Sequence, residues 1–244
     1  MVIFIGLSLA GDIKVGSYTL NKGSYPDILF AKEEEDEPII EIADTLPLPV
    51  ETIVSPDTTV HNVLVFGDSM THHLAMSIAK YGTKNNYKVT GVTWESSSIP
   101  GWRNSGKIEE YMEMSKPDFI FISLGSNEME LKHFERRIGD IEAVTEKMGD
   151  IPYVWVGPPL WKEDKGLYSV LEKGVPKGKV FRINESVDIE RGPDHIHPTR
   201  HGADQWADTL MRWIKTTEHP ILTEIPDSGT SIKGHKFIYL HPDE

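Results

Sequence analysis

A serine follows a continuous apolar run, in a position where it could act as a nucleophile. The run is residues 63–66, and Gly67, Asp68 and Ser69 come directly after it, before a segment with helical spacing. Such a turn between strand and helix exposes the serine hydroxyl at the edge of a sheet and puts its amide near a helix N-terminus, which suits a nucleophile and an oxyanion donor. Asp and Ser are also good helix N-caps, and for this segment alone a cap is the more frequent explanation.

A second polar segment, Gly125-Ser126-Asn127-Glu128, ends the apolar run 119–122. Gly125 permits a close backbone approach, and the Asn127 side chain carries an amide N–H that can point at a developing oxyanion. Taken alone, a turn followed by an N-cap explains the same residues. Because ligands gather at the carboxyl ends of strands in open α/β sheets, we expect this segment at the same sheet edge as the serine.

A base for the serine is found towards the C-terminus, where Asp194 and His197 stand three residues apart before a helix. A serine nucleophile needs a base, and the base needs an acceptor at its other ring nitrogen; this pair supplies both from one short segment. His195 is adjacent to Asp194 and is expected to point elsewhere. The spacing of His195, His197 and His201 could also bind zinc, but no second acidic or histidine cluster accompanies it, so we expect neither a metal nor another cofactor.

Together the three segments resemble the signature blocks of the SGNH (GDSL) hydrolases. They occur in the family's order, with the serine near the start of the domain and Asp-x-x-His near its end, and the resemblance covers residues 61–217. It implies Ser69 as the nucleophile, His197 as general base and acid, and Asp194 as the residue that orients His197. It also implies Asn127 and the backbone amide of Ser69 as oxyanion donors.

Two positions depart from the pattern of that family. The glycine that would give a further amide to the oxyanion hole is poorly matched; Gly101, in the run 96–102, is the preferred candidate and Gly106 the weaker one. Glu128 stands where an aspartate commonly follows the asparagine. This difference concerns the internal hydrogen bonds of the loop more than the role of Asn127.

Strand and helix signals alternate from residue 61 onward. Apolar runs predict strands at 63–66, 87–93, 119–122, 153–156, 180–183 and 236–240, and helical spacing predicts helices at 74–81, 108–114, 130–148 and 202–215. This alternation predicts an α/β fold with a mostly parallel sheet covered by helices. The resemblance implies the flavodoxin-like, three-layer αβα sandwich of the SGNH fold. We expect a hydrolase domain over 61–218 and a C-terminal tail over 219–244.

Residues 1–60 are expected to form a separate, β-rich extension. They hold three Lys and eleven acidic residues, a net charge of −8 out of −13 for the 244-residue chain. Strands are predicted at 2–9 and 13–20 and a proline-containing linker at 46–57. The acidic block 33–37 is a solvated loop or an interaction surface, and we expect the extension to dock to a protein partner or an oligomer.

Composition excludes several classes of protein. The chain has no cysteine, which excludes a disulfide scaffold, thiolate zinc sites and a cysteine nucleophile. The acidic balance argues against nucleic acid or an anionic membrane as partner. The N-terminal apolar run is short and lacks a basic region, so we expect no cleaved signal peptide, and no stretch reaches the roughly 20 apolar residues of a membrane span. The compartment stays open, with action in the cell envelope, outside the cell or in a virus particle all compatible with the sequence.

The expected activity is ester hydrolysis through an acyl-enzyme, on an acylated small molecule or glycan. Trp102 and Trp161 lie near predicted strand ends, where they could stack on sugar rings or fill the core. No long apolar lid is evident, which favours short-chain, acetyl esters of carbohydrate over long acyl chains. The alternative is a catalytically retired module of the same fold that serves as a structural or binding component of a cell-surface assembly or virus particle.

Overall fold

The structure is a computed structural model that describes residues 13–15, 18–20, 60–131, 133–183 and 187–243. Near the N-terminus, β1 (Ile13–Val15) and β2 (Tyr18–Leu20) pair in antiparallel fashion. The single strand predicted over 13–20 was therefore wrong, because its two halves pair with each other. The strand predicted at 2–9, the acidic block 33–37 and the linker 46–57 lie outside the described residues.

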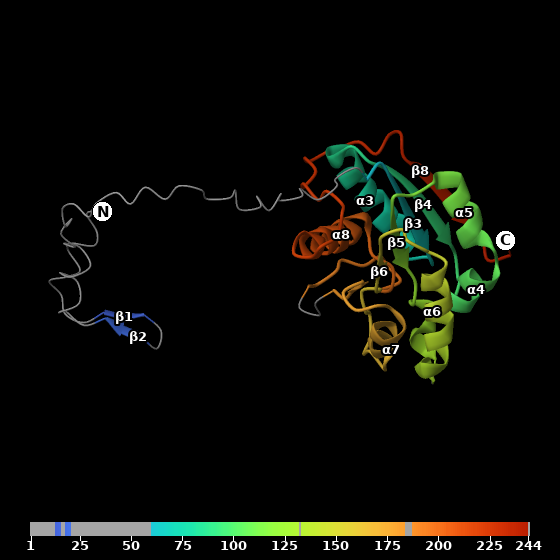
Figure 1. Ribbon diagram of the computed structural model, residues 1–244, viewed down its shortest axis with the longest axis horizontal. Helices are drawn as coiled ribbons and strands as arrows, with labels where there is room; N and C mark the ends of the chain where they lie inside the picture. The colour runs from blue at the N-terminus through green and yellow to red at the C-terminus, as the bar shows by residue number, and fades with distance from the viewer. Residues whose placement is uncertain (1–12, 16–17, 21–59, 132, 184–186, 244) are drawn as a thin grey trace, which may run out of the picture. The chain divides into compact units, whose positions relative to one another are not determined.

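A six-stranded sheet forms the centre of the part that begins at residue 60 (Figure 1). Its strands are β3 (Asn62–Gly67), β4 (Lys88–Trp94), β5 (Phe119–Ser123), β6 (Tyr153–Val156), β7 (Val180–Phe181) and β8 (Lys236–Leu240). Every pairing is parallel, in the order β7-β6-β5-β3-β4-β8. The predicted three-layer α/β architecture is confirmed.

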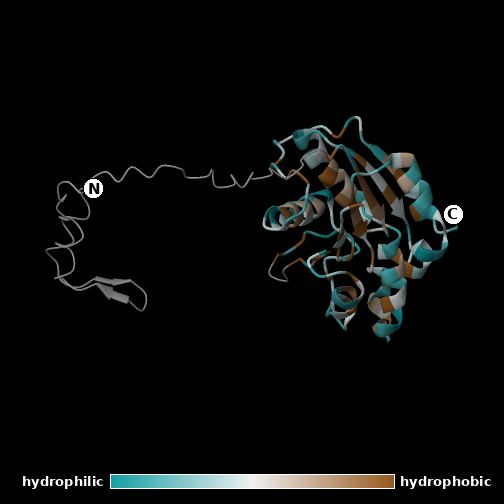
Figure 2. Ribbon diagram, in the orientation of Figure 1, coloured by the Kyte–Doolittle hydropathy of each residue, from teal (hydrophilic) through white to brown (hydrophobic). Residues whose placement is uncertain are grey.

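Alternate residues of the central strand β3 enter two different cores. Val63 and Val65 belong to the apolar cluster on one face of the sheet, and Leu64 and Phe66 belong to the cluster on the other. Since side chains of a strand alternate between the faces, a strand covered on both sides reads as the unbroken apolar run seen in the sequence. Figure 2 shows the hydrophobic residues gathered in the strands and on the helix faces that meet them.

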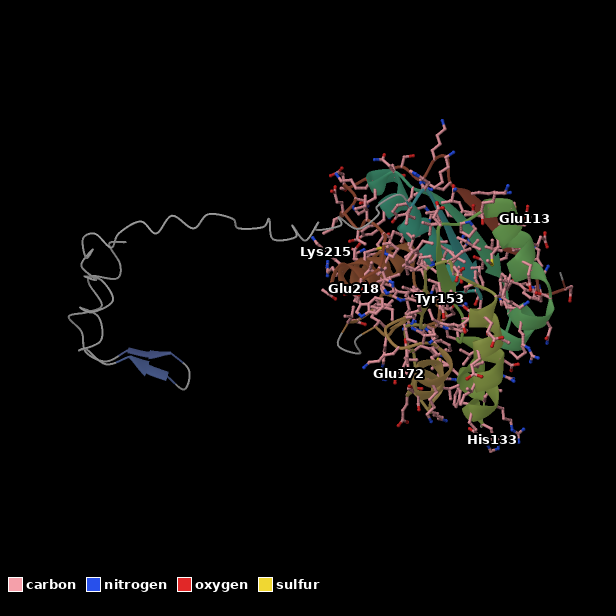
Figure 3. All side chains as sticks on the ribbon, in the orientation of Figure 1. Glu113, His133, Tyr153, Glu172, Lys215 and Glu218 are labelled. Atoms are coloured by element: carbon pink, nitrogen blue, oxygen red, sulfur yellow. The ribbon has the colours of Figure 1, made fainter. Side chains whose placement is uncertain are left out.

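The helices divide between the two faces. Those of the described part are α3 (Thr71–Asn85), α4 (Ile99–Asn104), α5 (Lys107–Ser115), α6 (Ile138–Glu146), α7 (Leu167–Gly174) and α8 (Arg200–Lys215), with short 3-10 turns at Asn127–Glu130 and Phe134–Arg137. Helices α3 and α8 pack on the first cluster, and α4 to α7 contribute to the second. Their outer faces are charged; Glu113, Glu172 and Lys215 are exposed on α5, α7 and α8 (Figure 3).

Several elements differ from the sequence-based predictions. The long helix predicted over 130–148 is broken into two 3-10 turns and the shorter α6, and β7 covers two residues where four were predicted. Helices α4 and α7 were not predicted. The α4 segment Ile99–Asn104 has a proline and a glycine in its first turn, which made it resemble a loop.

Candidate active site

The serine and histidine segments meet at the carboxyl edge of the sheet. Ser69 follows β3, and His197 lies in the loop that leads into α8. The Ser69 Oγ lies 2.9 Å from His197 Nε2, and His197 Nδ1 lies 2.6 Å from Asp194 Oδ2. With the ring proton on Nδ1, the serine hydroxyl donates to Nε2 and Nδ1–H donates to the carboxylate. The three side chains therefore form one continuous chain of hydrogen bonds.

The Asp194 carboxylate organises its own loop. Its Oδ1 accepts the backbone N–H groups of Ile196 at 2.9 Å and His197 at 3.0 Å, while Oδ2 accepts the His197 ring. His195, which lies between Asp194 and Ile196, adopts a left-handed backbone conformation with φ of 58°. The hydrogen bond from Ile196, followed by those from the ring and backbone of His197, lowers the pKa of Asp194 to about 2 although the side chain is exposed. The acceptor for the His197 ring thus stays ionised at neutral pH.

Arg191 and His73 hold the rest of this loop. The Arg191 guanidinium donates to the carbonyl of Ile196 at 2.5 Å and to those of Pro159 and Leu160 at 3.2 and 3.0 Å. His73 Nδ1 lies 3.1 Å from the carbonyl of Pro198. The loop is therefore tied both to the segment after β6 and to the first turn of α3, and the position of the His197 ring relative to Ser69 depends on these contacts.

Asp68 joins the ends of β3 and β5. It is buried, and its carboxylate accepts the backbone N–H of Met70 at 3.1 Å and that of Ser126 at 3.0 Å. Its own N–H donates to the Ser123 carbonyl at 3.1 Å. Burial raises the pKa of Asp68, with the hydrogen bonds acting in the opposite direction. The capping interpretation of this segment was wrong, because the N-cap position of α3 is Met70, which has no side-chain cap; Asp68 instead links the turn to the segment after β5, and Ser69 lies within hydrogen-bond distance of His197.

Asn127 and Glu128 together hold the segment before α4. Asn127 Nδ2 donates to the Ser97 carbonyl at 2.8 Å, and Glu128 Oε1 accepts the backbone N–H of Ile99 at 2.8 Å. Asn127 is exposed, whereas Glu128 is buried, with a second carboxylate oxygen that has no partner among the described residues. Burial, followed by the nearby charge of Asp68, raises the pKa of Glu128 to about 7. The longer glutamate therefore links the asparagine loop to the N-terminus of α4.

The structure does not support two of the positions proposed from the sequence. The Gly101 N–H donates to Ser98 Oγ at 3.3 Å as part of the α4 cap, so it already has an acceptor. Trp102 is fully buried, packs on Phe66 with ring centroids 4.9 Å apart, and donates from its indole N–H to Ser97 Oγ. It fills the core and cannot stack on a sugar. Trp161 is partly buried against both apolar clusters, and its role in binding stays a prediction.

A cavity of about 220 Å³ opens beside the serine and histidine. It is lined by Ser69, Met70, His72, His73, Glu95, His197, Pro198 and Tyr239. Sequence reasoning did not identify Glu95 or Tyr239 as site residues. The available signal was the strand predicted at 236–240, but nothing in the sequence says that this strand pairs with β4. A larger cavity of about 450 Å³, beside Pro159 and Leu160, contains neither catalytic candidate.

No helix among the described residues is both long and apolar enough to cross a membrane. Across the same residues, no group of three or more His, Asp or Glu side chains is arranged to hold a metal ion.

Known structures share this fold. Comparisons with models of protein families and with curated proteins gave no match. Among solved structures, LAE5, an alpha/beta hydrolase from the metagenome of Lake Arreo, Spain, matches with a TM-score of 0.51 and 10% identity, over 65% of this chain and 98% of its own. A family 3 carbohydrate esterase of Clostridium thermocellum matches with a TM-score of 0.49 and 15% identity, over 63% and 94%. A Desulfitobacterium hafniense protein described as lipolytic and of the G-D-S-L family matches with 0.45 and 14%, over 62% and 98%.

These likenesses concern the fold. The domain shares the α/β fold of LAE5, with a six-stranded parallel sheet at its centre. At sequence identities of 10 to 15%, these similarities do not assign the activity or the catalytic residues of any of these proteins to this chain.

Proposed function

We propose that the protein is a serine ester hydrolase with Ser69 as nucleophile, His197 as general base and acid, and Asp194 as the orienting carboxylate. The observation that carries the proposal is the chain of hydrogen bonds from Ser69 through His197 to Asp194, at 2.9 and 2.6 Å. Ser69 Oγ attacks the ester carbonyl while His197 Nε2 takes its proton. The same proton then passes to the leaving alcohol, and a water deprotonated by His197 cleaves the acyl-enzyme.

The oxyanion formed in both steps needs hydrogen-bond donors beside Ser69. The backbone N–H of Ser69 has no acceptor among the described residues, so it is available for this purpose. Asn127 uses one amide hydrogen on the Ser97 carbonyl, which fixes the side chain and leaves the second hydrogen for the substrate. Gly101 is not proposed as an oxyanion donor, because its N–H already donates to the Ser98 hydroxyl in the cap of α4.

The preferred substrate class is a short-chain ester, and an acetyl ester of carbohydrate in particular. The cavity beside the nucleophile is small, about 220 Å³, and its lining includes the hydrogen-bonding side chains of His72, Glu95 and Tyr239. A cavity of this volume does not accommodate a long fatty chain beside the alcohol portion of an ester.

The test is acetate release from a panel of acetylated polysaccharides, measured with the wild type and Ser69→Ala. Turnover should disappear in the variant while the thermal unfolding temperature stays within a few degrees. Labelling by a fluorophosphonate provides a second measurement, because it requires an activated serine and not a particular ester. Equal turnover in the two proteins would exclude Ser69 as nucleophile. Failure of the wild type to label would favour the alternative, a retired module that acts by binding.

A further inference from the structure

The C-terminal strand brings an aromatic side chain to the proposed active site. Strand β8 runs parallel to β4, with Tyr239 in register with Thr93 and Leu240 in register with Trp94. Because parallel strands end at the same edge of a sheet, the end of β8 lies at the edge where β3 delivers Ser69. Tyr239 thereby lines the cavity that also contains Ser69 and His197.

Main-chain contacts hold the end of β8 in place. The N–H of Glu95 donates to the Leu240 carbonyl at 3.0 Å, and the indole N–H of Trp94 donates to the His241 carbonyl at 3.1 Å. The His241 ring lies 3.8 Å from a Glu95 carboxylate oxygen. The wall that carries Tyr239 is thus fixed to the end of β4 before any substrate arrives, which reduces the entropy lost on binding.

The ring of Tyr239 is oriented but not buried. His72 from α3 packs edge-on against it, with centroids 5.6 Å apart and an interplanar angle of 88°. Tyr239 is nevertheless 44% exposed, and it is the one aromatic among the large exposed hydrophobic side chains of the described residues. Burial, and then the charge and hydrogen bond of Glu95, raise the pKa of Tyr239. The phenol and the Glu95 carboxylate line the same cavity, so a ligand in it can contact both.

The positions of Tyr239 and Glu95 relative to His197 indicate which part of the ester these two side chains contact. His197 delivers a proton to the leaving alcohol, so the alcohol oxygen must lie next to Nε2. The cavity that contains His197 contains Tyr239 and Glu95, whereas Asn127, on the oxyanion side, is not part of its lining. The alcohol portion of the ester thus lies against Tyr239 and Glu95.

We propose that Tyr239 and Glu95 form a sugar subsite that selects the alcohol portion of the substrate. The aromatic face packs on the C–H face of a pyranose, and the Glu95 carboxylate accepts hydrogen bonds from ring hydroxyls. The cavity lining includes a carboxylate and no Lys or Arg, which favours a neutral sugar over an anionic one. This inference rests on the proposed ester hydrolase activity and adds specificity-determining residues to it.

The test compares kcat/KM for acetylated xylo-oligosaccharides with kcat/KM for methyl acetate, whose alcohol portion has no ring that could pack on Tyr239. Tyr239→Ala should lower the ratio of the two values about tenfold, mainly through KM on the oligosaccharide. Tyr239→Phe keeps the ring and should retain most of the ratio, and Glu95→Gln should lower it through the weaker acceptor. Met114→Ala is the matched control, because Met114 has nearly the same exposure, 42%, and lies outside the cavity lining. It should leave both activities unchanged.

A binding measurement separates failure of the subsite from failure of the proposed function. Calorimetric titration of Ser69→Ala with acetylated xylo-oligosaccharide should detect binding, and adding Tyr239→Ala should weaken it about tenfold. If wild type and Ser69→Ala proved equally inactive, this titration would still support or refute the subsite. Equal loss of kcat/KM on both esters in Tyr239→Ala would overturn the proposal, as would unchanged oligosaccharide binding. A stronger effect on acetylated pectin fragments than on the neutral oligosaccharide would overturn the preference for a neutral sugar.

Discussion

Replacing Glu128 by glutamine should change how the stability of the protein depends on pH. Glu128 is 2% exposed, its Oε1 accepts the Ile99 N–H, and its Oε2 has no partner among the described residues. Burial and the charge of Asp68 raise its pKa from the ordinary 4.5 to about 7. Glutamine has the shape of the protonated carboxyl and keeps an oxygen for Ile99, but it cannot ionise.

The expected magnitude follows from the difference between the two pKa values. The folded protein holds a proton on Glu128 up to about pH 7, whereas the unfolded chain releases it near pH 4.5. The raised pKa therefore contributes stability that is fully present below pH 4.5 and is lost as the pH rises through about 7. At 1.36 kcal/mol for each pH unit, the loss between these limits is about 3 kcal/mol.

The assay is urea unfolding of wild type and Glu128→Gln at pH 4.5, 5.5, 6.5 and 8. The free energy of unfolding of the wild type, minus that of the variant, should fall by about 3 kcal/mol across the series, because groups that titrate in both proteins cancel. Glu113→Gln is the control, since Glu113 is exposed on α5, and its difference from wild type should stay nearly constant. A flat difference for Glu128→Gln would refute the argument that this carboxyl is protonated in the folded protein at mildly acidic pH.

Two further predictions concern catalysis and the turn after β3. Asp194→Asn keeps an oxygen for the two backbone N–H groups, but it removes the charge that faces His197 Nδ1. The kcat on p-nitrophenyl acetate should therefore fall about 10³- to 10⁴-fold, with little change in stability. A loss of kcat below tenfold would contradict the role of Asp194. Gly67→Ala places a Cβ 1.8 Å from a main-chain oxygen of β5 and should cost about 3 kcal/mol or more, measured by urea unfolding. The matched control is Gly139→Ala in α6, where a Cβ meets open space and should stabilise by about 0.5–1 kcal/mol. Similar effects of the two alanines would show that the close approach at Gly67 is unimportant.

Local pattern was sufficient for most of the sheet. The runs 63–66 and 119–122 predicted central strands because those strands are covered on both faces, so the side chains of both runs are all apolar. The helix predicted over 130–148 was wrong in extent, because apolar spacing does not reveal the 3-10 turns that precede α6. Helix α7 was missed although it has a clear apolar face, because its eight residues are too few to stand out from the loops around them.

The sequence by itself determined the alternation of strands and helices. It also predicted that Ser69, Asn127, Asp194 and His197 belong to one active site. Residue types and order carry that information because each motif is local and stands at the end of a strand or the start of a helix. Only the tertiary structure decided which hydrogen bonds the named groups make. In the folded protein the Gly101 N–H donates to the cap of α4, Trp102 is buried, and Tyr239 lines the same cavity as Ser69. Such contacts join residues far apart in the chain, and they depend on strand pairing and packing that no short sequence pattern encodes.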